Sequence, residues 1–215
     1  MPKSPFTLSF DQLPELLPIF PLSGAVVLPG GSLPLNIFEP RYLNMVQDAM
    51  RSNQLIGMIQ PKDNSSKPSL FDVGCAGRIQ RYEEVAGGRL EILIAGLCRF
   101  NIKEELDSAR GYRIVKANWA NYRLDIERSN EETTVDRQPL LRALHRYFEI
   151  NKLDTDWDKI EEIDQAMLVN NLLTFLPLTK EDKQLLVETA SPNDRIKSCI
   201  AILDRQKSDG NETRH

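Results

Sequence analysis

The clearest hydrophobic pattern in the chain is a strand with one apolar face at residues 89–103. Apolar residues occupy alternate positions there, namely Leu90, Ile92, Ile94, Cys98, Phe100 and Ile102. Because the side chains of a strand alternate between two faces, this pattern predicts a half-buried strand. Gly96 shares the apolar parity, so we expect a bulge or close backbone approach there, where the strand bends to close a barrel. Arg99 has the opposite parity, so we expect a mild effect when alanine replaces it.

The first 120 residues are predicted to be mainly strands. Further apolar runs predict strands at residues 13–27, 32–38, 55–60 and 112–119. The pair Gly87-Gly88 predicts a hairpin turn, because glycine accepts positive φ. One helix interrupts the strands at Pro40, since proline is favoured in a first helical turn. Its apolar face is predicted from the helical spacing of Tyr42, Val46, Ala49 and Met50.

The hydrophobic period becomes helical after residues 121–137, which are charged and polar and which we interpret as a connection. Residues 160–175 are predicted to form one helix that Pro177 ends. Thr179 with Asp182, and Ser191 with Asp194, are N-cap signatures of two further helices. Asn170 and Asn171 interrupt the apolar helix, so we expect at least one of these amides to hydrogen-bond the backbone of a neighbouring loop.

Together these elements predict an α+β fold with two halves. Residues 1–120 are predicted to form a β pseudo-barrel with one embedded helix, and residues 138–207 a four-helix bundle. Residues 121–137 connect the halves, and residues 208–215 are predicted to be a solvated tail.

Composition and motifs argue against several classes of function. The net charge of −4 and the pI near 5.4 disfavour a phosphate-binding surface built on bulk charge. No Gly-x-x-x-x-Gly-Lys-Ser/Thr loop occurs, and the Ser66-Lys67 and Lys197-Ser198 pairs do not predict a catalytic dyad. Three scattered cysteines and two isolated histidines give no metal-ligand spacing, so we expect neither a metal nor a cofactor.

The chain carries no apolar run as long as a membrane span requires, about 18 residues, and no hydrophobic signal stretch. We therefore expect a protein of the reducing cytoplasm, with no membrane contact. Cys75 and Cys98 lie in strand patterns, where buried thiols are expected.

Four segments in order carry a resemblance to a known family. Residues 17–46 read LPIFPLSGAVVLPGGSLPLNIFEPRYLNMV, and residues 73–79, 94–100 and 176–186 read VGCAGRI, IAGLCRF and LPLTKEDKQLL. This series resembles the Lon N-terminal domain, the substrate-recognition part of the Lon protease. It looks most like the bacterial proteins made of that domain alone, and more distantly like the Lon domain of cereblon.

The resemblance implies a PUA-like β half and a non-enzymatic protein-recognition module. Such a module would bind unfolded or hydrophobic polypeptide, or a specific protein partner, and would be linked to proteolysis or protein quality control. RNA binding through the PUA-like half is the alternative, which the acidic charge makes a weaker hypothesis. A hydrolase is a third hypothesis, but no nucleophile and base arrangement supports it. The sequence does not predict the oligomeric state.

A binding surface is expected in the cleft between the two halves. The candidate residues for contact with a polypeptide are Pro29, Gly30, Phe38, Glu39, Arg41, Tyr42 and Arg99. An alternative interpretation places Phe38 and Tyr42 in the core, with Glu39 and Pro40 starting the helix. For Arg99 the alternatives are a structural ion pair with Glu39 or Glu91, or simple solvation.

Overall fold

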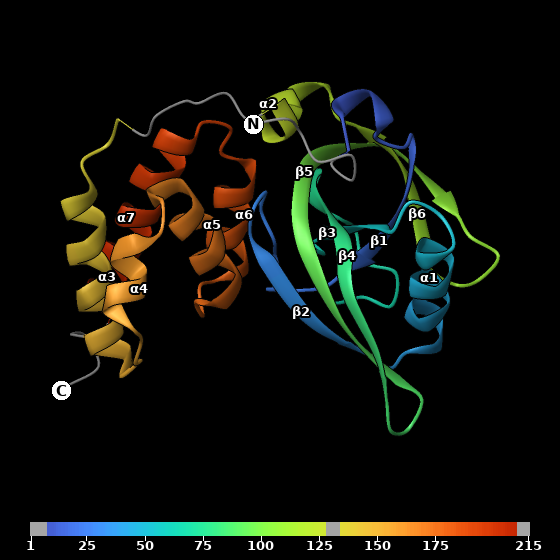
Figure 1. Ribbon diagram of the computed structural model, residues 1–215, viewed down its shortest axis with the longest axis horizontal. Helices are drawn as coiled ribbons and strands as arrows, with labels where there is room; N and C mark the ends of the chain where they lie inside the picture. The colour runs from blue at the N-terminus through green and yellow to red at the C-terminus, as the bar shows by residue number, and fades with distance from the viewer. Residues whose placement is uncertain (1–7, 128–133, 210–215) are drawn as a thin grey trace.

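The computed structural model describes residues 8–127 and 134–209, so residues 1–7, part of the predicted connection (128–133) and most of the predicted tail (210–215) lie outside it. Strands and helices segregate into a β-rich half and a helical half (Figure 1). The strands are β1 (Leu16–Pro21), β2 (Ser32–Ile37), β3 (Leu55–Ile59), β4 (Val73–Val85), β5 (Arg89–Asp107) and β6 (Arg113–Asn118). The helices are α1 (Pro40–Met50), α2 (Arg123–Glu127), α3 (Arg137–Asn151), α4 (Trp157–Glu162), α5 (Gln165–Phe175), α6 (Lys180–Glu188) and α7 (Pro192–Asp209). Two 3-10 turns, Phe10–Gln12 and Ala120–Tyr122, precede β1 and α2.

The sheet closes on itself because β5 is long enough to have three partner strands. The order of the described strands is β2-β5-β4-β3-β1-β6, and β6 pairs again with β5. The first part of β5 pairs with β2, and its last part pairs with β6. Only the β1 and β3 pairing among these is parallel. The predicted α+β fold, with a near-barrel and one embedded helix, is confirmed, while β2 remains at the open end of the sheet.

Gly96 is the point at which β5 bends. The register between β4 and β5 shifts beside Gly77, whose partner is Gly96. The backbone of Gly96 also bonds to the preceding loop, accepting from Gly30 N at 3.0 Å and donating to Gly31 O at 2.8 Å. A Cβ atom at position 96 would overlap the carbonyl oxygen of Leu28. The predicted close backbone approach is therefore confirmed.

The apolar residues of β5 on the two sides of the bend pack into two separate hydrophobic clusters. Leu90, Ile92 and Ile94 pack with the buried face of α1 on one side of the sheet. Cys98 and Phe100 instead join a second cluster that includes the barrel interior and the helical half. The two halves therefore share one hydrophobic core, whereas α1 has its own.

The predicted strand at residues 13–27 is shorter in the structure, where β1 ends at Pro21. Residues 22–31 form a loop that turns at Gly24, whose φ is +72°. Val26, Val27 and Leu28 are nevertheless buried in this loop. Some of its polar backbone groups bond to strands, and others bond to side chains: Gly30 N donates to Gly96 O at 3.0 Å, and Gly24 N donates to Gln60 Oε1 at 3.1 Å. The apolar run in this loop therefore indicates that its residues are buried, but it does not show that they form a strand.

Within residues 134–209 the helical half has five helices, one more than expected, because residues 160–175 do not form one helix. Ile163 is extended between α4 and α5, and the Asp164 carboxylate caps α5 by accepting from Met167 N. The Arg137 guanidinium donates to the carbonyls of Ile160 and Ile163, which satisfies the end of α4. The N-caps predicted at Thr179 and Ser191 are present.

Helix α6 docks on the barrel largely through polar groups. Gln184 accepts from Gln60 Nε2 at 3.1 Å and donates to Val73 O at 3.1 Å. The buried Lys183 donates from Nζ to Gly24 O at 2.7 Å. These bonds fix the helical half against β3, β4 and the 22–31 loop. Among the described helices, none has the length and apolar character needed to cross a membrane.

Replacing Gly96 by alanine should destabilise the barrel closure. The added methyl group collides with a backbone oxygen that is itself held in the 22–31 loop, so we expect about 1–3 kcal/mol less unfolding free energy. Urea denaturation measures the effect. The matched control is Gly87→Asn, because Gly87 has no neighbour within 4 Å and its φ of +83° suits asparagine. Equal urea midpoints for Gly96→Ala and the parent would contradict the close-approach argument.

Candidate functional site

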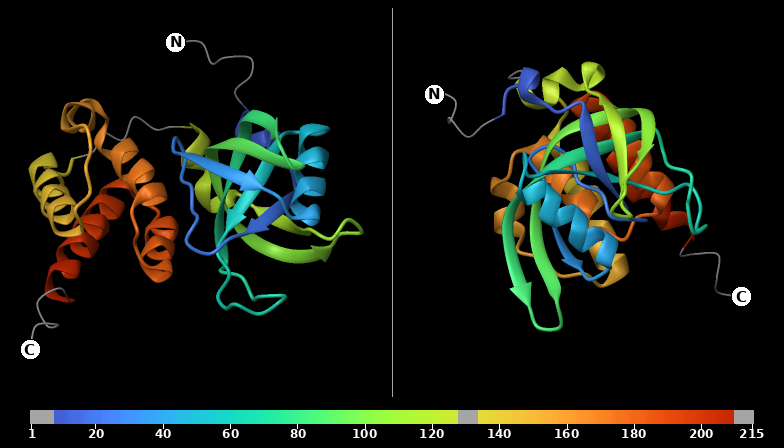
Figure 2. Two further views of the ribbon diagram at one scale, coloured as in Figure 1. Left: turned by 90° about the horizontal axis from the view of Figure 1, so that it is seen from below. Right: turned by 90° about the vertical axis from the view of Figure 1, so that its right-hand side faces the viewer.

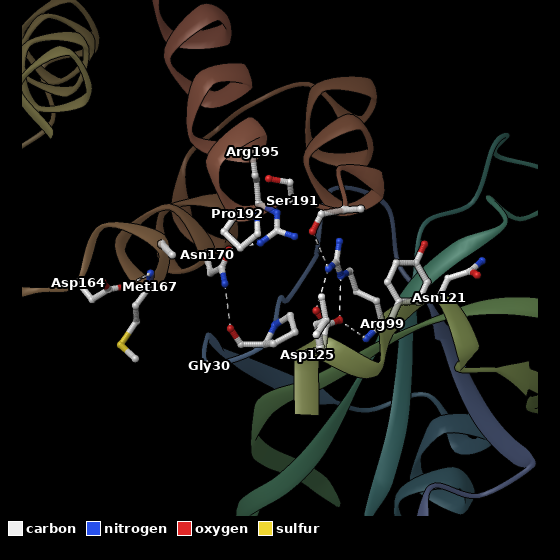
Figure 3. Close-up of a pocket in the computed structure, with 15 residues that line it drawn as sticks. Gly30, Arg99, Asn121, Asp125, Asp164, Met167, Asn170, Ser191, Pro192 and Arg195 are labelled. Carbon is white, nitrogen blue, oxygen red and sulfur yellow. Dashed lines mark hydrogen bonds and ion pairs between the residues drawn. The ribbon is translucent and has the colours of Figure 1, made fainter. Parts of the chain in front are cut away.

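A groove of about 640 Å³ lies where the helical half meets the barrel. Its walls come from the 22–31 loop, β5, the segment entering α2, the start of α5 and the turn between α6 and α7 (Figure 3). A cavity of this size accommodates several side chains of a peptide or one small ligand. The predicted cleft between the two halves is therefore present.

Arg99 forms the floor of the groove and is 4% exposed. Its guanidinium binds both oxygens of Asp125, with Nε–Oδ2 and Nη2–Oδ1 distances of 2.8 Å (Figure 3). Asp125 Oδ2 also accepts from the backbone N–H of Arg99 at 2.9 Å. The guanidinium further stacks on Tyr122, 4.6 Å from its ring centre. The structural ion pair, one of the alternatives for Arg99, is therefore present, but its partner is Asp125 and not Glu39 or Glu91. Because the pair is buried, we expect its loss to be more than mild.

The same guanidinium reaches the end of α6. Arg99 Nη1 donates to Thr189 O at 2.7 Å and Val187 O at 3.3 Å, and Nη2 donates to Ala190 O at 3.2 Å. These carbonyls lie at the C-terminal end of a helix, where a cation is favoured by the helix dipole. Burial disfavours the charged form of Arg99, but hydrogen bonding and attraction from Asp125 outweigh it and raise the pKa. One side chain therefore joins β5, α2 and α6.

Arg195, on the first turn of α7, is the second buried cation at the groove and is also 4% exposed. Its Nε donates to Leu186 O at 3.1 Å and its Nη2 to Thr189 O at 2.8 Å. Its Nη1 donates to Asn170 Oδ1 at 3.1 Å. Burial, and secondarily the charge of Arg99, lower the pKa of Arg195 to about 10, so it stays charged at neutral pH.

Asn170 connects this cation to the opposite wall. Its Nδ2 donates to the carbonyl of Pro29 at 2.9 Å (Figure 3). The predicted bond from Asn170 to the backbone of a neighbouring loop is confirmed. It fixes the Pro29-Gly30 turn against α5, so the groove has a rigid side wall.

Two large apolar side chains are accessible at the rim of the groove. Leu124 on α2 is 59% exposed, and Met167 on α5 is 40% exposed. They belong to different halves, because α2 follows the barrel and α5 lies in the helical half. Large apolar side chains exposed beside a cavity mark a surface suited to hydrophobic contact.

The predicted binding residues separate into two groups. Pro29, Gly30 and Arg99 line the groove. The other four, Phe38, Glu39, Arg41 and Tyr42, lie at the end of β2 and the start of α1. Helix α1 is on the side of the barrel away from the helical half (Figures 1 and 2). The seven residues therefore do not form one surface.

In the second group, Phe38 and Tyr42 differ in burial, so the interpretation that places both in the core holds for only one of them. Phe38 is 64% exposed, so it is not a core residue. Tyr42 is buried and packs on Phe20, with ring centres 4.1 Å apart, so it belongs to the core. Glu39 pairs with Arg41 at 2.8 Å on the surface, and not with Arg99. Only Phe38, Glu39 and Arg41 of this group can meet a partner without local unfolding.

The residues that line the groove include no histidine, lysine or cysteine. Cys98 and Cys199 are buried, and burial raises the pKa of each thiol to about 12, so neither is a thiolate at neutral pH. The exposed ring of His145 stacks on Trp157 at 3.6 Å, in the α3 and α4 region. Among the described residues, no three His, Cys, Asp or Glu side chains gather to hold a metal ion.

Sequence reasoning did not identify Leu124, Asp125, Met167 and Arg195 as groove residues. Asp125 lies in the segment interpreted as a polar connection, and the partner acids considered for Arg99 were Glu39 and Glu91. A charged pattern with few apolar residues gave no sign of burial. Arg195 follows an N-cap signature and reads as an ordinary helix residue. Their roles depend on contacts between distant segments.

Removing Asp125 should destabilise the protein strongly. Asp125→Ala leaves the Arg99 charge buried without its counter-ion, which costs about 3–5 kcal/mol in comparable pairs. The control is Glu39→Ala, which breaks an exposed pair and should cost less than about 1 kcal/mol. The free energy of unfolding in urea distinguishes the two variants. Similar losses for both would show that Arg99 and Asp125 are solvated.

Comparisons with known proteins agree on one family. A model described as the ATP-dependent protease La (LON) substrate-binding domain matches residues 16–205. The Lon protease of Roseiflexus castenholzii is 26% identical over 206 residues, and Lon protease 2 of Myxococcus xanthus is 24% identical over 217 residues. These alignments cover 91% and 94% of this chain but 25% of each protease. The chain therefore spans about a quarter of the length of these relatives.

Solved structures share the fold. The crystal structure of the Lon N-terminal domain protein from Xanthomonas campestris has a TM-score of 0.63 at 24% identity, covering 86% of this chain and 97% of that one. The N-terminal domain of the Mycobacterium avium complex Lon protease has a TM-score of 0.62 at 16% identity, covering 88% and 98%. Because the family model extends over most of the chain, this protein belongs to the LON substrate-binding domain family.

Proposed function

We propose that this protein is a recognition module that binds apolar segments of unfolded polypeptide in the groove between its halves, without catalysis of its own. The observation that carries the proposal is the pair of exposed apolar side chains, Leu124 and Met167, at the rim of a preformed cavity. Family membership supports it, because the matched family is described as the substrate-binding domain of a protease. A function linked to proteolysis or protein quality control is the corresponding cellular role.

Physical chemistry favours weak and adaptable binding at this site. Burial of apolar surface contributes about 25 cal/mol per Å², from which the cost of ordering the polypeptide must be subtracted. The walls are already held by Asn170, Arg99 and Arg195, so little ordering of the protein itself is required. A single groove offers a small interface, and we expect dissociation constants that are roughly micromolar or weaker.

Phe38 defines a second candidate surface, because it is an aromatic residue that is 64% exposed and lies beside the paired Glu39 and Arg41. It lies away from the groove and would extend contact with a long polypeptide. Binding of RNA remains the rival function, and its mark would be a steep loss of affinity with salt.

The double variant Leu124→Ser/Met167→Ser should weaken binding of a reduced, iodoacetamide-alkylated unfolded protein by about tenfold, because two apolar contacts are lost. Fluorescence titration at low and high salt measures this, and apolar binding should persist at high salt because it is not screened. The matched control is Leu185→Ser, which removes a leucine that is 51% exposed on α6 and does not line the groove.

Three outcomes would contradict the proposal. Equal loss in the Leu185→Ser control would show that the effect is not local. If only Phe38→Ser loses binding of the unfolded protein, the binding site lies at the end of β2 and not in the groove. No binding by the parent at either salt concentration would remove polypeptide recognition, and binding of RNA that disappears with modest salt would replace it.

A further inference from the structure

The two buried arginines at the groove differ in how their charges are balanced. Arg99 has a carboxylate partner, since Asp125 binds it through both oxygens. The hydrogen-bond partners of Arg195 are neutral, namely the carbonyls of Leu186 and Thr189 and the amide oxygen of Asn170. Within the described residues, Arg195 has no ion pair with a carboxylate. Burial of a cation without a counter-ion costs free energy, unless another group supplies the negative charge.

The surroundings of Arg195 balance its charge only in part. Asp125 and the carbonyls at the C-terminal end of α6 attract it, but both oxygens of Asp125 are bound by Arg99. The neighbouring Arg99 is a like charge, and together with burial it lowers the pKa of Arg195. The N-terminus of α7, which begins at Pro192 and borders the groove, adds positive potential. The remaining lining acid is Asp164, an exposed residue that already accepts from Met167 N as the cap of α5. It is hydrated at the rim, so it screens the buried cation poorly.

We propose that the groove accepts a carboxylate of the bound polypeptide at Arg195, while adjacent apolar side chains of that polypeptide contact Leu124 and Met167. This inference rests on the proposed function and specifies its substrate class: segments in which an acidic group neighbours apolar residues. The carboxylate comes from a free C-terminus or from an Asp or Glu side chain. Exposed apolar side chains at the rim, beside a buried arginine that has no carboxylate partner, match this combination.

Three fluorescent peptides of the same apolar sequence test the inference on the intact protein. One ends in a free carboxylate, one has an amidated end and an internal Asp, and one has an amidated end and Asn in place of that Asp. Charge-assisted hydrogen bonds are about twice as strong as neutral ones, so we expect the acidic peptides to bind about tenfold more tightly than the neutral one. Whichever acidic peptide binds more tightly identifies the source of the carboxylate.

Asp164→Asn provides a test that does not disturb the fold, because asparagine is also a good N-cap. Removing the rim charge should increase affinity for the acidic peptides by about threefold, and it should leave the neutral peptide unchanged. Arg195→Gln should abolish the preference for acidic peptides, with circular dichroism confirming that the helices remain.

The outcomes separate this inference from the proposed function. Equal affinity for acidic and neutral peptides would overturn the carboxylate site and leave apolar recognition standing. No binding by any peptide or by the unfolded protein would remove both. If a short RNA displaces the acidic peptide at comparable concentration, Arg195 binds phosphate and not a carboxylate, which would overturn the proposal.

Discussion

The burial of the Arg99 guanidinium is the constraint on which the arrangement of this molecule depends. A charge that leaves water must be surrounded by partners of good geometry, and few conformations provide them. Here those partners come from α2 and from the last carbonyls of α6, while Arg99 itself comes from β5. The barrel, the connecting segment and the helical half are therefore brought to a single point. The groove forms beside that point, so its shape is set by the same interaction.

Much of the fold follows from local rules that a single sequence displays. The parity of β5, the bend at Gly96, the start of α1 at Pro40 and the cap at Thr179 all depend on residues near one another in the chain. The inward amide of Asn170 was predictable for the same reason, since a polar residue within an apolar helix requires a partner. Such rules predict elements and burial well.

The site was predicted only in part, because it depends on pairing between distant segments. The cleft was expected, and Pro29, Gly30 and Arg99 do line it. The partner of Arg99 lies 26 positions away in a segment that looks solvated, and no spacing rule connects the two. Phe38 and Tyr42 show the same limit on a smaller scale. Both are aromatic residues beside a helix start, yet only Tyr42 finds a place against Phe20.

The position of β2 at the open end of the sheet has a consequence for how partners can attach. At an exposed strand edge, another chain can extend the sheet by backbone pairing. In β2 the middle residue opposite Leu93 is Pro34, which has no backbone N–H to offer to an added strand. At this position the edge offers no donor, so an extended segment of another chain cannot pair continuously along it.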